Sequence, residues 1–146
     1  MKITSKRINF KTRGETDIID ITGEVTNAIK ASEIRNGIVT IFVPGATGAV
    51  TTIEYEPGLL KDLPAMLERI APKEIEYEHE KRWHDGNGHS HVRASLLGPS
   101  ITIPFEDGRL TLGTWQQIVF IELDNKSRSR EIVLQIMGDG GVKRIP

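Results

Sequence analysis

The sequence predicts an α+β protein built from two helices and mostly antiparallel strands. Apolar residues recur with helical spacing in two segments of the first half, whereas alternating or β-branched segments bounded by turn residues fill most of the rest. The second half holds consecutive strands, so its sheet is expected to be largely antiparallel. With 146 residues, the chain is expected to form a single domain, 1–146.

The first predicted elements are an edge strand and a helix. Residues 2–12 mix β-branched and polar side chains in rough alternation, which is typical of a half-exposed strand near a sheet edge. The helix that follows is expected to have Thr22 as its N-cap and the Asn36-Gly37 pair as its stop signal. Its buried face comprises Ile21, Val25, Ala28, Ile29 and Ser32.

Two more strands and a second helix are expected in the middle of the chain. GIVTIFV at 37–43 is a continuous apolar run typical of a buried central strand, and AVTTIEY at 49–55 predicts another strand. The second helix is expected to be capped by Asp62, to hold Pro64 in its first turn and to end before Pro72. Its core face comprises Leu59, Leu60, Leu63, Met66, Leu67 and Ile70.

The remaining elements are strands. LLGPSITIPF at 96–105 predicts one strand, and the Asp-Gly pair at 107–108 marks a tight hairpin after it. Two further strands are expected at 115–123 and 131–137.

Composition excludes several classes of function. Nineteen Lys and Arg against twenty Asp and Glu give a formal net charge of -1, and aromatic residues are few, so we expect no nucleic-acid partner. The absence of cysteine means that any bound metal must be held by nitrogen and oxygen ligands. No apolar run reaches membrane-spanning length and no signal peptide is recognisable, so we expect a cytoplasmic protein without a membrane partner.

All four histidines lie in one segment, EHEKRWHDGNGHSH at 78–91. Imidazole and carboxylate groups are the ligands of divalent metals such as zinc and manganese, and Gly86 and Gly88 would let the chain turn sharply around Asn87. If the segment is extended, His89 and His91 point to the same side. The spacing matches no standard zinc motif, so a polar loop without metal is the alternative interpretation.

Three stretches together are similar to the YjbQ family. They are the block from Tyr77 to Asp124, which includes GTWQ at 113–116, the block ATGAVTTIEYEPG from Ala46, and SREIVLQIMG from Ser129. The resemblance covers the chain from about Gly37 to its end. It implies a mixed α+β, sandwich-like subunit that forms a homotrimer, with a polar cluster near the subunit boundary.

The resemblance also implies site residues. The family's Tyr-x-His pattern falls on Tyr77 and His79, and its Asn-x-x-x-His pattern falls on Asn87 and His91. His84 and His89 have no regular counterpart, so they are auxiliary metal ligands or loop residues. The family's glutamate and small hydroxyl residue fall on Glu54 and Thr47. Many members carry a histidine at the position of Gly45, a difference that weakens the expectation of a three-histidine site.

The activity implied by the resemblance is that of a secondary thiamine-phosphate synthase, which joins a phosphorylated thiazole to a pyrimidine pyrophosphate. Displacement of pyrophosphate requires a divalent metal (zinc, magnesium or manganese) and basic side chains, for which Arg93 and Arg130 are candidates, although for each of them taken singly a surface arginine with a solvated head group is the simpler interpretation. Two other possibilities remain open at this point. They are a metal-dependent hydrolase of a phosphorylated metabolite and a non-catalytic trimer that binds a metal or a phosphoryl ligand.

Three residues in the second half of the chain complete the set of candidate site residues. Trp115 is a candidate stacking platform for a ligand ring, or else a residue that packs in the core beside Leu112 and Ile118 or at the trimer interface. Gln116 is a candidate for orienting a ligand. Glu122, on the same strand face as Gln116 by even spacing, is a candidate general base or a partner of a histidine.

Overall fold

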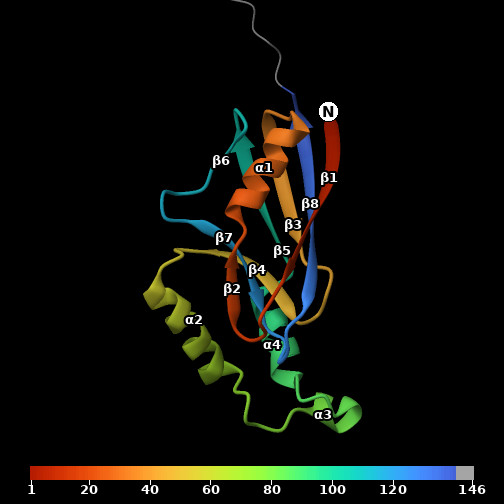
Figure 1. Cartoon of the computed structure of the whole chain (residues 1–146), viewed down its shortest axis with the longest axis vertical. Helices are drawn as coiled ribbons and strands as arrows, with labels where there is room; N and C mark the ends of the chain where they lie inside the picture. Colours follow the sequence, from red (N-terminus) through yellow and green to blue (C-terminus); the bar gives the residue numbers. More distant parts are fainter. Residues whose placement is uncertain (141–146) are drawn as a thin grey trace, which may run out of the picture.

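The computed structural model describes residues 1–140, which fold into two antiparallel sheets and four helices. The larger sheet has the strand order β1, β8, β3, β5, β6, with the bounds Lys2–Lys11, Ser129–Asp139, Asn36–Phe42, Ser100–Glu106 and Arg109–Leu110. The smaller sheet has the order β2, β7, β4, with the bounds Asp17–Asp20, Gln117–Glu122 and Gly48–Ile53. Figure 1 shows β1 running beside β8 along one side of the molecule. The predicted α+β class is confirmed.

The smaller sheet is buried on both faces. Alternate residues of β7 point to opposite sides, so Ile118 and Phe120 pack against the larger sheet and helix α1 (Thr22–Ser32), whereas Val119 and Ile121 pack toward helices α2 (Pro57–Ile70) and α4 (Gly88–Leu97). This alternation divides the interior into two apolar cores. Helix α4, which carries His89 and His91 of the histidine segment, packs on the second core.

Helix α1 lies where the apolar spacing predicted it, but both of its end signals were misjudged. Thr22 is the first helical residue and its hydroxyl accepts a hydrogen bond from the Ile118 backbone N–H, at 2.9 Å, instead of capping the helix. The helix ends at Glu33, which adopts a left-handed conformation (φ 62°). Asn36-Gly37 therefore does not stop the helix; these residues begin β3.

Helix α2 begins earlier than predicted. Glu56 is the N-cap, and its carboxylate accepts hydrogen bonds from the backbone N–H groups of Gly58 and Leu59. Pro57 occupies the first helical position, where its missing N–H costs nothing. The prediction that Asp62 caps the helix is wrong, and Pro64 lies inside the helix.

The histidine segment contains two helices that the sequence interpretation missed. Helix α3 spans Glu78–Trp83, and α4 spans Gly88–Leu97. Gly86 and Gly88 surround the connection, and Gly88 has no room for a side chain, because a Cβ there would lie 2.5 Å from the Tyr77 Cβ. The chain at 89–91 is therefore helical and not extended, and the prediction of a strand that starts at Leu96 is wrong. Four helices are present among the described residues where two were predicted.

The predicted strands are otherwise confirmed, with two adjustments. β1 is an edge strand, as expected, and Asp107 and Gly108 have positive φ in the predicted tight turn between β5 and β6. β3 is central in its sheet, but only alternate residues are buried. The short strand β2 was not predicted. None of the helices found over residues 1–140 is long and apolar enough to cross a membrane.

Candidate functional site

Helix α4 sorts the residues of the histidine segment onto two faces. Residues four apart share a helical face, so Asn87 at the N-cap and His91 lie on one side, whereas His89 and Arg93 lie on the other. His91 and His89 therefore do not point the same way, as they would in an extended chain. The two faces of α4 therefore contact different groups of residues.

The Asn87 and His91 face meets His79 of α3. The rings of His79 and His91 have centroids 4.4 Å apart, and His79 Nε2 lies 3.2 Å from a carboxylate oxygen of Asp85. The side-chain amide of Asn87 is buried and contacts both His79 and Asp85. One of its two polar atoms lies 2.8 Å from Asp85 Oδ1 and 3.0 Å from His79 Nε2. We call these four residues the histidine cluster.

The amide of Asn87 also faces a second carboxylate. In one orientation its nitrogen lies 3.5 Å from Asp124 Oδ1, and its oxygen then faces Asp85 and His79. In the other orientation the nitrogen donates hydrogen bonds to Asp85 and His79, and the oxygen faces Asp124. Asn87 thus connects the histidine cluster with buried charges at the end of β7.

Those charges form the carboxylate cluster, which consists of Thr47, Glu122, Asp124, Arg128 and Arg130. Glu122 and Asp124 have no solvent exposure. Arg130 Nε donates to Glu122 at 2.9 Å, Arg128 Nε donates to Asp124 at 2.9 Å, and the Thr47 hydroxyl donates to Asp124 at 3.1 Å. Two buried anions are therefore matched by two arginines, which offsets the large cost of burying an unpaired charge.

The ionised state of Asp124 is stabilised by these partners. Burial alone would raise the pKa of this carboxyl group, but the Arg128 guanidinium and the hydrogen bonds donated by the Asn125 backbone and Thr47 outweigh it, so the pKa lies below its ordinary value. Asp124 is accordingly a fixed anion near neutral pH.

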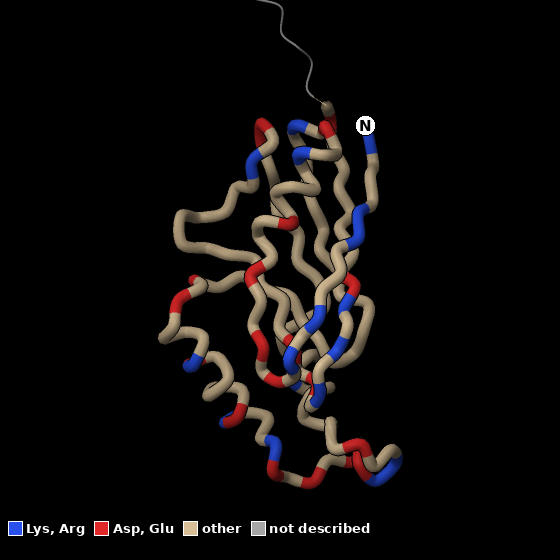
Figure 2. The backbone as a smooth tube through the Cα atoms, viewed as in Figure 1, with Lys and Arg blue, Asp and Glu red and all other residues tan. Residues whose placement is uncertain are grey.

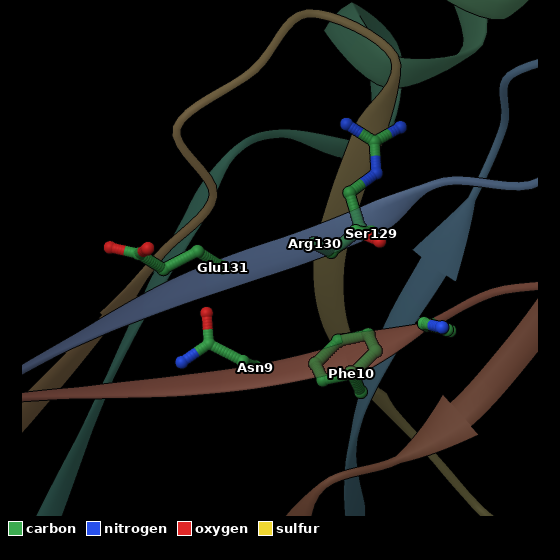
Figure 3. A pocket seen from close by; sticks show the side chains of 6 residues that line it. Asn9, Phe10, Ser129, Arg130 and Glu131 are labelled. Atoms are coloured by element: carbon green, nitrogen blue, oxygen red, sulfur yellow. The ribbon is translucent and has the colours of Figure 1, made fainter.

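Arg130 connects the carboxylate cluster with a cavity of about 420 Å³ at the β1 edge. The cavity is lined by Asn9, Phe10, Lys11, Ser129, Arg130 and Glu131. Figure 3 shows the Arg130 side chain rising from β8 toward the chain that connects β3 and β4, away from Glu131. On that side its Nη1 would lie 3.1 Å from a Cβ at Gly45. Among the hydrogen bonds found within residues 1–140, none uses this Nη1 as donor.

The other face of α4 holds a separate network, which we call the brace (Glu15, Glu68, Lys73, His89 and Arg93). His89 is 1% exposed and its Nε2 lies 2.6 Å from Glu15, whose carboxylate also contacts Lys73 at 2.7 Å. Arg93 donates to the Ala71 carbonyl at 2.9 Å and to Glu68 at 2.7 Å. The structure therefore places His89 and Arg93 in contacts that tie α4 to α2 and the β1–β2 loop, apart from the candidate site.

Three predicted residues lie at the opposite end of the smaller sheet. Gly48 pairs with Glu122 at the end of β4 and β7 near the site, whereas Ile53 pairs with Gln117 at the other end, about 17 Å away. Glu54, Trp115 and Gln116 adjoin that far end. Trp115 is 71% exposed, so the alternative prediction of a core position is wrong, and Gln116 precedes β7 and does not share a strand face with Glu122.

A divalent metal ion would need several nitrogen or oxygen ligands that converge on one point. Within residues 1–140, no group of three or more His, Asp or Glu side chains is arranged to hold a metal. The histidine cluster brings two such side chains, His79 and Asp85, together with the Asn87 amide, whose oxygen can also be a metal ligand. His84 is exposed at the end of α3 and lies outside this set.

Sequence reasoning missed Asp85, Asp124 and Arg128. Asp124 follows Glu122 by two positions, a spacing that puts both on one face of a continuing strand and could have identified it. Arg128 lies in a run with Lys126 and Arg130, and such runs of basic residues are common on solvated surfaces. Asp85 is brought to His79 by the turn between α3 and α4, which only its glycines indicate in the sequence.

Comparison with known proteins gives a consistent result. Residues 6–139 match the family model described as "UPF0047 protein YjbQ-like". A UPF0047 protein of Methanothermobacter thermautotrophicus is 39% identical over 138 residues, which covers 94% of each chain. UPF0047 protein YugU of Bacillus subtilis is 35% identical over 91% of this chain and 98% of its own.

Solved structures agree. A YbjQ-like protein of unknown function from Sulfolobus solfataricus superimposes with a TM-score of 0.90 at 33% identity, covering 94% of this chain and 99% of that chain. An uncharacterised YjbQ/UPF0047 protein from Clostridium acetobutylicum gives a TM-score of 0.83 at 35% identity, covering 90% and 99%.

Proposed function

The chain belongs to the UPF0047 family of YjbQ-like proteins, and on this premise we propose that it is a metal-dependent enzyme that acts on a small phosphorylated molecule. One observation carries the proposal. Ligand-type atoms of His79, Asp85 and Asn87 lie within 2.8–3.2 Å of one another beside His91. Nitrogen and oxygen acceptors at such distances repel one another unless a proton or a cation lies between them.

Asn87 accounts for both states of this cluster. Without a cation, its amide nitrogen faces Asp85 and His79 and donates to both. With a cation, the opposite orientation is favoured, because the amide oxygen becomes a ligand and the nitrogen reaches Asp124. His79, Asp85 and Asn87 would hold the ion, with His91 alongside, and zinc or manganese suits this mixed nitrogen and oxygen set better than magnesium. The bound ion would supply positive charge that polarises a phosphoryl oxygen or acidifies water.

The carboxylate cluster and the cavity suit the phosphorylated substrate. Arg130 is held in place by Glu122, while its Nη1 points past Gly45 and keeps its donor capacity. Lys11 lines the same cavity and adds a second positive charge. The fixed guanidinium and the ammonium group can therefore neutralise a phosphate or a departing pyrophosphate without reorganisation of the protein.

We propose a reaction like that of a secondary thiamine-phosphate synthase, in which pyrophosphate leaves a pyrimidine methylene as the thiazole nitrogen bonds to it. Arg130 and Lys11 would take the charge of the leaving group, and His91 would donate a proton to the departing pyrophosphate oxygen. A hydrolysis of a phosphorylated metabolite uses the same groups and is the second candidate. The homotrimer implied by the family resemblance, with the cavity at the β1 edge near a subunit boundary, is part of the same proposal.

Elemental analysis of untagged protein tests the metal site first. Wild-type protein is expected to bind about one zinc or manganese per chain after titration, and His79→Ala/His91→Ala is expected to bind none. His84→Ala is the matched control, since His84 is exposed and outside the histidine cluster. Equal metal content in all three proteins, or none in any of them, would reject the metal site.

Turnover then separates an enzyme from a binding protein. Thiazole phosphate and pyrimidine pyrophosphate are supplied to the metal-loaded wild type and to Arg130→Gln, and both pyrophosphate release and coupled product are measured. Coupled product supports the transferase, pyrophosphate or phosphate release alone supports the hydrolase, and saturable binding without product supports the non-catalytic trimer. Arg130→Gln is expected to lose at least about tenfold in kcat/KM if its guanidinium neutralises the leaving group.

A further inference from the structure

We infer that the hollow beside Trp115, at the end of the smaller sheet away from the histidine cluster, is a second binding site whose ligand is a small organic cation. The hollow has a volume of about 360 Å³. It is lined by Thr52, Ile53, Glu54, Gly113, Thr114, Trp115 and Gln116. It lies about one strand length from Glu122, so it is separate from the proposed catalytic site of the same chain.

The hollow is held in shape by hydrogen bonds around Gln116. The Gln116 side-chain amide donates to the Thr52 hydroxyl at 3.0 Å, and its carbonyl accepts from the Gly113 backbone N–H at 3.1 Å. These two bonds fix the turn that carries Trp115 to the end of β4. This hydrogen-bonded loop holds the Trp115 indole in solvent. The side chain is 71% exposed, although it is one of the largest apolar side chains of the protein.

The charge around the hollow selects the ligand class. Glu54 is the single charged residue among the lining residues, and residues 110–117 contain no Lys or Arg. Figure 2 shows the same contrast, with basic residues along β1 and none on the loop between β6 and β7. An indole face attracts cations through its quadrupole, and a neighbouring carboxylate adds to this attraction. An ammonium or a cationic heteroaromatic ring satisfies both groups, whereas an anion is repelled.

Trp83 provides an internal control for this inference. It is also exposed, at 62%, but the guanidinium of Arg82 already lies 5.5 Å from the centre of its ring. A further cation would be repelled there. The chain has two tryptophans in all, so each indole N–H gives its own signal in a nitrogen-proton correlation spectrum.

The test is a titration of the whole ¹⁵N-labelled chain with choline and, in parallel, with 3,3-dimethyl-1-butanol, its uncharged analogue of the same shape. Choline is expected to move the Trp115 signal saturably and to leave Trp83 unmoved, with the alcohol at least about fivefold weaker. Glu54→Gln is expected to weaken choline about threefold to fivefold without weakening the alcohol. Glu54 is exposed, so this variant is expected to keep the fold, which the unchanged backbone spectrum verifies.

Two results would overturn the inference. One is an equal response to choline and to the alcohol, since it would show an apolar surface without charge selection. The other is an equal movement of Trp83 and Trp115, or of neither, since it would show that the hollow does not distinguish itself from any exposed indole. Neither result depends on whether the histidine cluster binds a metal.

Discussion

Two polar networks adjoin opposite faces of helix α4; both pair acidic with basic side chains, but they differ in whether every basic group has a partner. The brace is closed, because His89, Lys73 and Arg93 are each paired with Glu15 or Glu68. The carboxylate cluster is open, because Arg130 is paired with Glu122 on one side and presents Nη1 toward Gly45 on the other. Burial and charge alone therefore do not identify a functional group; a donor left available beside a cavity does.

The largest effect is expected when the buried ion pair of the carboxylate cluster is broken. Arg130→Met leaves Glu122 with no solvent and only the Thr12 hydroxyl and the Asp124 N–H as donors, so the free energy of unfolding should fall by about 3–5 kcal/mol. Urea unfolding measures this change. Glu122→Leu/Arg130→Met should cost less than the sum of the two single variants, and a loss below about 1 kcal/mol in Arg130→Met would contradict the pairing.

Breaking the brace should lower the free energy of unfolding by less, and it should not affect metal binding. Arg93→Met removes two hydrogen bonds from a buried guanidinium, to the Ala71 carbonyl and to the half-exposed Glu68, so a decrease of about 2 kcal/mol is expected in urea unfolding. Metal content and turnover should stay at the wild-type level in the folded protein. If Arg93→Met released the metal, the distinction between the two faces of α4 would fail.

Acid unfolding sharpens the comparison with a smaller change. The folded-state pKa of Asp124 lies below its ordinary value of 3.8, so its contribution to stability is present above that pH and is lost as the pH falls through the folded-state pKa. Arg128→Gln should raise this pKa and move the acid midpoint to a higher pH, by less than about one pH unit. Circular dichroism during acid titration measures the midpoint. A midpoint that moves lower would show that Arg128 does not stabilise the Asp124 anion.

The smallest effect is expected at His84, which belongs to neither network. It ends helix α3 with φ 57°, a left-handed conformation that glycine adopts without strain. His84→Gly should raise the free energy of unfolding by about 0.5 kcal/mol and leave metal content unchanged. Thermal unfolding and elemental analysis provide the two readings, and a destabilised or metal-free variant would assign His84 a role after all.

Periodicity predicted the class, the edge strand and the existence of α1 and α2, because those signals come from many residues at once. It missed α3 and α4, because Gly86, Asn87 and Gly88 look like a loop when the segment is read alone. Tertiary contacts decide that region: Gly88 packs against Tyr77, and α4 packs on the smaller sheet. The consequence for the site was large, since a helix and a strand divide His89, His91 and Arg93 differently between faces.

Local sequence patterns also do not show which of the candidate residues lie close together in the fold. Thr47, Glu122 and Arg130 meet in the carboxylate cluster and Asn87 adjoins it through Asp124, yet these residues come from four separate parts of the chain. Glu54 and Gln116 look equally suitable in the sequence but adjoin the opposite ends of the same strands. Strand register alone makes that separation, and register depends on the pairing of β4 with β7, which single residues do not reveal.

Gly45 gives the site a constraint on how it can evolve. A Cβ at this position would lie 3.1 Å from Arg130 Nη1, so any side chain there would displace the guanidinium by a few tenths of an ångström or more. A histidine at 45 and an arginine in its present position at 130 therefore compete for the same space. Mutational effects at the two positions should be epistatic, and the two positions are expected to drift as a pair, with the order of substitutions deciding which intermediates keep their activity.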